Sequence, residues 1–178
     1  MNESRISTKD ISQIGLFTAL IAVMAQISIP MPLGVPMTMQ TFAISLAGVM
    51  LGAKKGALSA LAYALMGAVG APVFAGFRGG LGIVLGPTGG FIISFPLMAW
   101  IIGFGSEKDG KWPLALGLFA GTAVSFIAGM IFFSAVTGRG LEAAFSACVL
   151  PFIPTSAVKA LAAGTVGMKI RQKVMSLG

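Results

Sequence analysis

The sequence predicts an all-α integral membrane protein of six transmembrane helices, forming a single domain over residues 1–178. Apolar residues make up 56% of the chain and charged residues only 10%, whereas a soluble domain carries about 25% charged residues. The apolar residues gather in long blocks, which is the pattern of membrane spans rather than of a soluble core. A chain of 178 residues accommodates six such helices joined by short loops.

Six apolar segments define the expected spans. They are Ile11–Ile29, Gln40–Leu51, Ala57–Gly70, Phe91–Phe104, Pro113–Val136 and Thr155–Ile170. The first segment is too long for the apolar core of a signal peptide, so we interpret it as a retained span. A further apolar stretch, Leu141 to Ile153, is cut by Pro151 and ends before Pro154, which predicts a short interfacial or re-entrant helix.

The distribution of lysine and arginine predicts the orientation of these spans. With the N-terminus inside, nine cations fall on the cytoplasmic side: Arg5, Lys9, Lys54, Lys55, Lys108, Lys111, Lys169, Arg171 and Lys173. Only Arg78 and Arg139 fall outside, and Lys159 lies near the outer end of the last span. The positive-inside rule therefore predicts a multi-pass protein of the cell membrane with both termini in the cytoplasm. Lipid is the expected surrounding, and nucleic acid is not an expected partner.

The residue types that most enzymes need are missing. The chain has no histidine, and Cys148 is its single cysteine, which excludes histidine-dependent triads and an internal disulfide. The five acidic residues all lie in loops or near span ends: Glu3, Asp10, Glu107, Asp109 and Glu142. We therefore expect no enzyme, no metal site, no cofactor and no carboxylate within a span to couple transport to an ion gradient.

Small residues recur every four positions in two of the predicted spans. They are Gly56, Ala60, Ala64 and Ala68 in the third span, and Gly117, Gly121, Ser125 and Gly129 in the fifth. Such stripes allow close packing of helices within a bundle. The first span carries Gly15, Ala19 and Ala22, which would dock a partner helix if their face looks outward.

Three segments on the predicted external side are candidates for a ligand site. They are the proline-rich loop that begins at Pro30, the glycine-rich run 70–90, and the segment from Pro151 to Lys159. The run 70–90 holds eight of the 25 glycines and a single charge, Arg78. Irregular backbone at membrane depth is tolerated only where protein buries it or where it lines a cavity. Convergence of these segments would make an apolar pocket with a few fixed polar groups, which is the usual form of a small-molecule site.

The charged candidates in this pocket favour an anionic ligand. Ser156 and Lys159 share one face of the last helix, for which Thr155 or Ser156 is the expected N-cap. An anion there would interact with both the lysine and the free N–H groups of the helix start. Arg78 could clamp a carboxylate with two hydrogen bonds. The alternatives are a snorkelling lysine and a solvated loop arginine.

The uncharged candidates would bind the rest of a ligand. Gln40 can donate and accept hydrogen bonds at once, as an amide or urea group requires, although it could equally face lipid headgroups. Phe74, Phe77 and Phe152 could wall the pocket, or serve only as interfacial anchors. Gly79 and Gly80 follow Arg78 directly, so they would lie close to any bound ligand.

Five motifs give the chain its resemblance to a known family. They are Val35-Pro-Met-Thr-Met-Gln-Thr-Phe, Leu51-Gly-Ala-Lys-Lys-Gly, Gly70-Ala-Pro-Val-Phe-Ala-Gly-Phe-Arg-Gly-Gly, Gly86-Pro-Thr-Gly-Gly, and Pro151-Phe-Ile-Pro followed by Lys159. In this order they resemble the BioY family, the biotin-binding membrane subunits (S components) of energy-coupling-factor (ECF) transporters. The family commonly has an Asp three residues before that lysine, where this chain has Ser156.

The resemblance implies the six-helix S-component fold with an outward-facing pocket closed by the first and third loops. It implies high-affinity binding of biotin, with Arg78, Ser156 and Lys159 at the positions of family ligand contacts. It also implies a partner module of one transmembrane coupling protein and two ATPases, which would supply the energy for uptake. The alternative is a self-sufficient vitamin facilitator or small channel that needs no ATPase.

Overall fold

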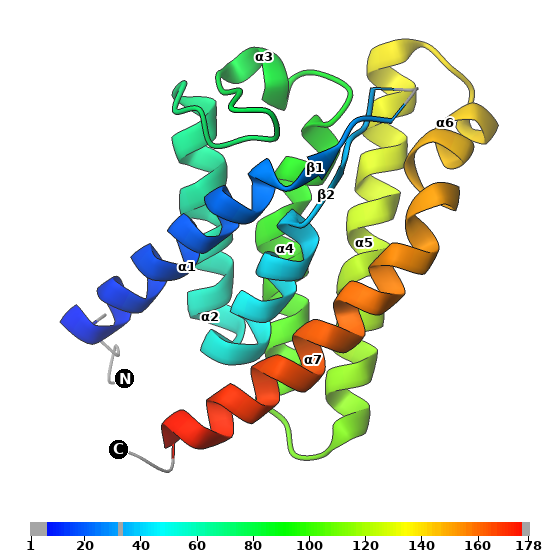
Figure 1. Ribbon diagram of the computed structural model, residues 1–178. Helices are drawn as coiled ribbons and strands as arrows, with labels where there is room; N and C mark the ends of the chain where they lie inside the picture. The colour runs from blue at the N-terminus through cyan, green and yellow to red at the C-terminus, as the bar shows by residue number, and fades with distance from the viewer. Residues whose placement is uncertain (1–6, 32–33, 176–178) are drawn as a thin grey trace, which may run out of the picture.

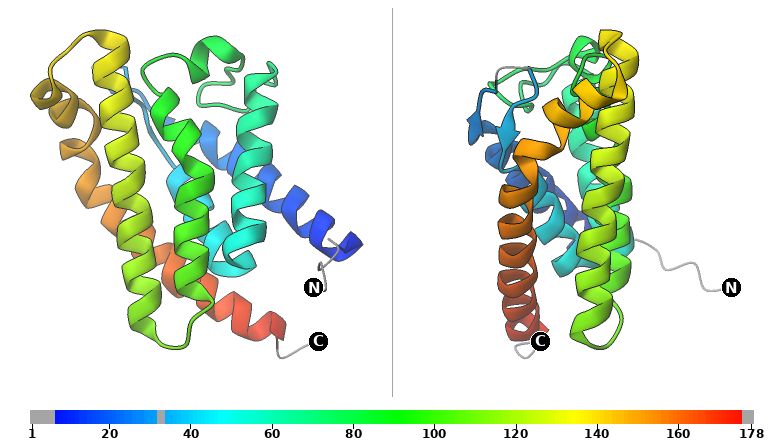
Figure 2. Two further views of the ribbon diagram at one scale, coloured as in Figure 1. Left: turned by 180° about the vertical axis from the view of Figure 1, so that it is seen from behind. Right: turned by 90° about the vertical axis from the view of Figure 1, so that its right-hand side faces the viewer.

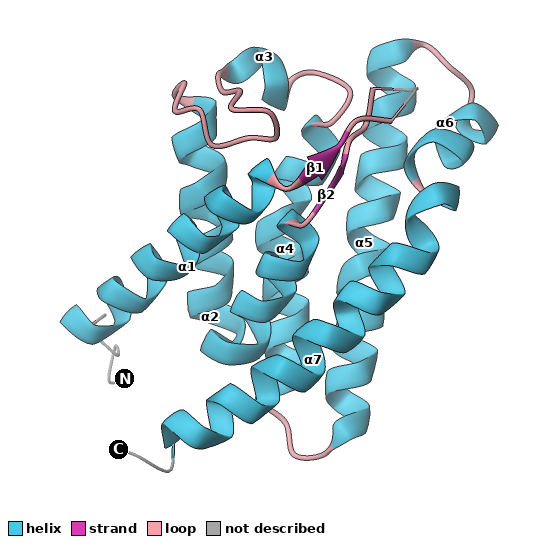
Figure 3. Cartoon of the chain, viewed as in Figure 1, coloured by secondary structure: helices cyan, strands magenta, loops and turns pink. Residues whose placement is uncertain are grey.

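The chain folds into a helical bundle with one short pair of strands near one end, shown by the computed structural model in Figures 1 and 3. The structure describes residues 7–31 and 34–175. Its elements are α1 Thr8–Gln26, β1 Ser28–Ile29, β2 Met37–Thr38, α2 Gln40–Ala68, α3 Leu81–Val84, α4 Gly89–Ser106, α5 Lys111–Thr137, α6 Leu141–Cys148, the 3₁₀ turn η1 Leu150–Phe152, and α7 Ile153–Met175. Glu3 and Arg5 lie outside the described residues, as do Pro32 and Leu33 of the first outer loop.

Five helical segments of the described residues are long and apolar enough to cross a membrane, against the six spans predicted. The difference lies in α2, which contains both the second and the third predicted span. Gly52 interrupts this helix with a φ of +81°, and the chain reverses its direction there (Figure 1). The two halves pack closely, because a Cβ at Gly56 would lie 2.9 Å from the Cα of Gly48. The predicted pair of short spans is thus one helical hairpin.

Small residues bring α4 and α5 into close contact. A Cβ at Gly117 would lie 3.1 Å from the carbonyl oxygen of Ile101, and one at Gly121 would lie 2.9 Å from that of Met98. Ser125 also meets Ser94 of α4, with their hydroxyl oxygens 3.2 Å apart. The small-residue stripe of the fifth predicted span therefore packs inside the bundle, as the sequence predicts, and leaves no room for larger side chains.

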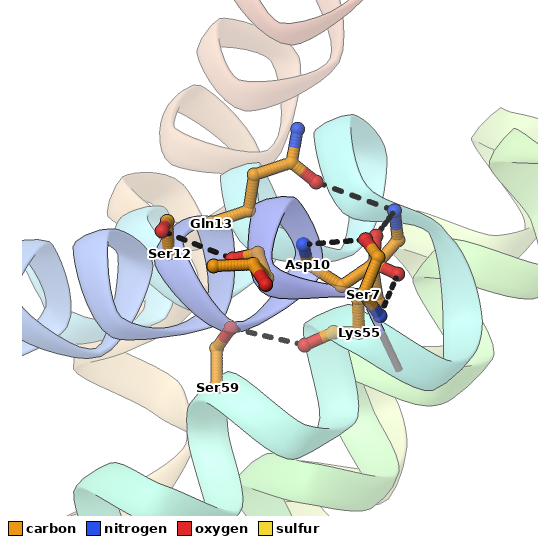
Figure 4. A network of polar contacts seen from close by, with 7 residues as sticks. Ser7, Asp10, Ser12, Gln13, Lys55 and Ser59 are labelled. Carbon is orange, nitrogen blue, oxygen red and sulfur yellow. Dashed lines mark hydrogen bonds and ion pairs between the residues drawn. The ribbon is translucent and has the colours of Figure 1, made fainter. Parts of the chain in front are cut away.

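Polar contacts at the end of the bundle opposite the glycine-rich loop attach α1 to α2. Ser7 and Asp10 form a capping box that begins α1, since each side chain accepts a hydrogen bond from the other's backbone N–H. Lys55 of α2 then forms an ion pair with Asp10 at 2.8 Å and donates to Gln13 Oε1 at 3.3 Å, as Figure 4 shows. The loop between α4 and α5 and the end of α7 lie at this same end of the bundle (Figures 1 and 2).

Two expectations are corrected by the structure. The all-α prediction misses β1 and β2, which pair antiparallel with Ser28 opposite Thr38 and so satisfy backbone groups of this loop. The last helix begins at Ile153 and not at an N-cap at Thr155 or Ser156; the Thr155 hydroxyl instead donates to the carbonyl of Phe152 at 3.0 Å. The stretch after Leu141 does form a short helix, α6, as predicted.

The turn at Gly52 yields a stability prediction. A Cβ at this position would overlap Glu107 Oε1, and the positive φ strains any other residue by about 1–3 kcal/mol. We expect Gly52→Ala to lower the thermal unfolding temperature in detergent. Gly82→Ala is the matched control, because a Cβ at Gly82 meets no atom within 4 Å. Equal unfolding temperatures for the two variants would contradict this role of Gly52.

Candidate ligand-binding site

The three candidate segments meet around one cavity at one end of the bundle. Its wall includes Val35, Pro36, Thr38, Gln40 and Thr41 of the first segment, Phe74, Ala75, Arg78, Ile83 and Thr88 of the second, and Phe152, Ser156 and Lys159 of the third. Phe91, Ile92 and Phe95 of α4 and Phe126 of α5 complete the wall. The predicted convergence of separate segments is therefore present in the fold.

Lys159 joins the last helix to the first loop. Its Nζ donates a hydrogen bond of 2.6 Å to the backbone carbonyl of Thr38, at the end of β2. Ser156 is buried one helical turn earlier and also lines the cavity. No carboxylate lines the cavity among the described residues, so the Lys159 ammonium has a carbonyl dipole for a partner and no opposite charge within the wall.

Gln40 lines the cavity and belongs to a chain of polar contacts. Its side chain is buried, with 7% of the residue exposed. Oε1 accepts from the Thr38 hydroxyl at 2.9 Å, and Nε2 donates to the hydroxyl of Tyr63. Tyr63 in turn donates to the carbonyl of Val73 at 3.2 Å. A carboxamide has two acceptor sites and two donors, so Gln40 retains one of each for a ligand.

The glycine-rich segment presents Phe74 and Arg78 to the cavity and turns Phe77 away from it. The backbones of Phe74 and Arg78 exchange two hydrogen bonds, of 2.9 and 3.2 Å, which close a tight turn. Phe77 sits at the tip of this turn with a φ of +55° and 73% of its surface exposed. Neither Phe77 nor the Gly79–Gly80 pair lines the cavity. Packing requires a glycine at position 79, since a Cβ there would overlap the carbonyl of Ala71.

Aromatic residues make up half of the apolar lining residues. Phe74 is almost fully buried and meets the ring of Tyr63 edge to face, with centroids 5.6 Å apart. Phe152 is also buried, whereas Phe91 and Phe126 are half-buried. Such a wall suits an apolar ligand body, and its few polar groups would fix the ligand's orientation.

Thr41 is one of the cavity residues that sequence reasoning missed, together with Thr38, Thr88 and the aromatic rings of α4 and α5. Among the residues the structure describes, Thr41 Oγ1 is the one buried side-chain polar atom that lacks a hydrogen-bond partner. An unpartnered buried hydroxyl costs free energy unless a ligand satisfies it. The signal in the sequence was that Thr38, Gln40 and Thr41 are the polar residues of an otherwise apolar loop.

The composition of the site decides which chemistry it can perform. Within the described residues no three His, Cys, Asp or Glu side chains come together as metal ligands. The cavity offers two cations, a carboxamide and hydroxyl groups around aromatic rings. This set can bind an acidic small molecule with an apolar body.

A family model decides the identity of the chain. The model of the BioY family matches residues 1–176. The chain belongs to the BioY family.

Curated BioY relatives match almost the whole chain. A protein of Pyrococcus horikoshii named a probable biotin transporter BioY is 41% identical over 93% of this chain and 98% of its own length. Proteins named biotin transporter BioY from Thermotoga maritima and Rhodobacter capsulatus are 38% and 36% identical, covering 89% and 92% of this chain and 93% and 94% of their own lengths. These are names of transporters and not of enzymes, in agreement with the sequence prediction.

A solved structure has the same fold. The crystal structure of the S-component for biotin from an ECF-type ABC transporter superposes with a TM-score of 0.84 and 27% sequence identity, covering 97% of this chain and 94% of that chain. The membrane-spanning S-component fold that the BioY resemblance implies is therefore confirmed.

The unpartnered hydroxyl of Thr41 can be tested without a ligand. Thr41→Val removes a buried hydroxyl that has no partner, so the unfolding temperature of the ligand-free protein is expected to stay the same or rise. Thr38→Val is the matched control, because it removes the hydrogen bond to Gln40 and is expected to cost about 0.5–1.5 kcal/mol. A destabilisation by Thr41→Val as large as that by Thr38→Val would show that the Thr41 hydroxyl is already bonded.

Proposed function

We propose that this chain binds biotin in the cavity between β2, the 74–78 turn and α7, and that it mediates biotin uptake as the substrate-binding component of an ECF-type transporter. The observation that carries the proposal is that two cations, Arg78 and Lys159, line an aromatic cavity whose wall has no carboxylate among the described residues. Biotin has a carboxylate for the cations, a ureido group for the hydroxyls and the carboxamide, and an apolar ring body for the phenylalanines. The names of the relatives and of the solved structure support this ligand.

In this proposal Lys159, Ser156, Arg78, Gln40, Phe74 and Phe152 contact the ligand, together with Thr41. Phe77, Gly79 and Gly80 lie outside the cavity wall, so their part is to shape the turn that carries Arg78. Ser156 occupies the position at which the family commonly has an Asp. A hydroxyl can still accept from a ureido N–H, although a neutral acceptor binds less strongly than a charged one.

The chain crosses the membrane six times in this proposal, with α2 contributing two short crossings on either side of Gly52. Both termini lie in the cytoplasm, and the cavity opens on the external face. The lysines of the Gly52 turn, of the α4–α5 loop and of the end of α7 gather at one end of the bundle, and Arg78 and Arg139 lie in loops at the other end (Figure 1), which is the asymmetry expected across the cell membrane.

Lipid is the expected partner of the outer helix faces. An open groove of about 560 Å³ runs between α5 and α7 and is lined almost entirely by apolar side chains, among them Leu118, Phe119 and Leu161. A lipid acyl chain fits this chemistry.

The energy for uptake would come from an ECF module of one coupling protein and two ATPases, docked on the exposed face of α1. Gly15 and Ala19 are exposed, a Cβ at Gly15 meets no atom within 4 Å, and Ala22 is half-buried at the edge of the same face. Small residues on an outward face allow close approach of a partner helix. A self-sufficient facilitator is not favoured, because the matching solved structure is described as part of an ECF-type ABC transporter.

The ligand site is tested by isothermal titration of the purified protein with biotin. We expect Lys159→Met and Arg78→Ala each to weaken binding at least tenfold, which is about 1.4 kcal/mol, because each removes a charge that faces the carboxylate. Arg139→Ala is the control, since Arg139 is an exposed loop cation that does not line the cavity. Unchanged affinity in both site variants would refute this placement of the ligand.

The docking face is tested by co-purification with a co-expressed ECF module. Gly15→Leu and Ala19→Leu place bulk on the outward face of α1 and are expected to abolish co-purification, while biotin binding by the isolated chain stays at the wild-type level. Leu116→Phe adds bulk at an exposed position of another helix, α5, and is expected to assemble normally. Normal assembly of both Leu variants would rule out this face.

A further inference from the structure

Gln26, the last residue of α1, holds the turn that carries Phe74 and Arg78. Its Nε2 lies 3.2 Å from the carbonyl oxygen of Val73, 3.3 Å from that of Phe74 and 3.0 Å from that of Ala22. Its Oε1 accepts from the backbone N–H of Phe77 at 2.9 Å. One carboxamide thus bonds both sides of the turn at once, from a helix about fifty residues earlier in the chain.

The bonded groups of the turn are those whose position matters for the cavity. Phe74 is a wall residue, and Phe77 has the left-handed φ that reverses the chain before Arg78. The carbonyl of Val73 accepts from Tyr63 as well as from Gln26. Through Tyr63 the same carbonyl is connected to Gln40, so the Gln26 carboxamide belongs to the polar network that lies behind the ligand cavity.

We propose that Gln26 is a positioning residue of the ligand site: its carboxamide fixes the 73–77 turn against the end of α1 and thereby sets where Phe74 and Arg78 stand in the cavity. The proposal rests on the proposed function for the identity of the ligand, but the anchoring of the turn does not depend on it. Gln26 does not line the cavity, so it acts through the turn and not by touching the ligand.

The position of Gln26 also connects the cavity with the exposed face of α1. Gly15, Ala19, Ala22 and Gln26 follow one another at spacings of four, three and four residues, so they lie along one side of the helix. A displacement of α1 therefore moves the anchor of the turn.

The contact uses the Gln26 carboxamide both as a hydrogen-bond donor and as an acceptor. Gln26→Leu keeps a similar volume but removes the donor and the acceptor together. The matched control is Gln13→Leu, which makes the same change in the same helix, at a glutamine that contacts Lys55 at the opposite end of α1. Both variants replace one glutamine carboxamide by an apolar side chain. A difference in binding or exchange between them therefore reports the contact of Gln26 with the turn.

The experiment combines hydrogen exchange with biotin titration on the full-length protein. In the ligand-free state, Gln26→Leu is expected to accelerate exchange of the Phe77 amide by at least tenfold, because that N–H loses its acceptor. The same variant is expected to weaken biotin binding at least fivefold. Gln13→Leu is expected to change neither quantity.

A double-mutant cycle distinguishes positioning from a general loss of stability. If Gln26 acts by placing Arg78, the Gln26→Leu/Arg78→Ala variant binds biotin at least twofold more tightly than the product of the two single effects predicts. Independent effects would overturn the positioning role. So would unchanged exchange at Phe77, or faster exchange with wild-type affinity. Absence of biotin binding in the wild-type protein would instead contradict the proposed function, and the exchange measurement would still decide whether Gln26 anchors the turn.

Discussion

The hydrogen bond from Lys159 to the carbonyl of Thr38 is the interaction on which the rest of the site depends. It connects α7 with β2 across 121 residues of sequence, and it places a cation in a cavity whose wall holds no carboxylate among the described residues. A charge in apolar surroundings is costly unless an opposite charge accompanies it. The carbonyl dipole satisfies one N–H of the ammonium but leaves its charge unneutralised, and an acidic ligand would supply what is missing.

The fold serves to bring distant segments to this cation. The reversal at Gly52 returns the chain to the end of the bundle that holds the cavity, where Tyr63 meets both Gln40 and Val73. At the opposite end, Arg171 of α7 donates to the carbonyls of Val49 and Ser106 at 3.1 and 2.9 Å, so α7 is held against α2 and α4 below the cavity. The aromatic wall stands on α4, α5, η1 and the 74–78 turn, and α4 and α5 pack closely through glycines and serines.

Much of this arrangement was predictable, and the rest failed for physical reasons. Hydropathy located every long helix, and the placement of lysines and arginines predicted which segments share an end of the bundle. The β1–β2 pair escaped prediction because two-residue strands carry no periodic signal. Phe77 lies outside the cavity wall, and its direction depends on a left-handed φ, which the sequence does not reveal. The sequence did not reveal the roles of Thr41 and Gln26, because both depend on the tertiary structure. The Thr41 hydroxyl is buried without a partner among the described residues, whereas the Gln26 carboxamide makes several hydrogen bonds to the 73–77 turn.

The central claim is that the cations of the cavity neutralise the charge of an acidic ligand. The most direct test is a comparison of biotin with biotin methyl ester, titrated into the wild-type protein under identical conditions. The two ligands share the ring system and the ureido group, and differ in the negative charge. The account predicts that the ester binds at least tenfold more weakly than biotin, a loss of about 1.4 kcal/mol. Equal affinities for the two compounds would contradict it.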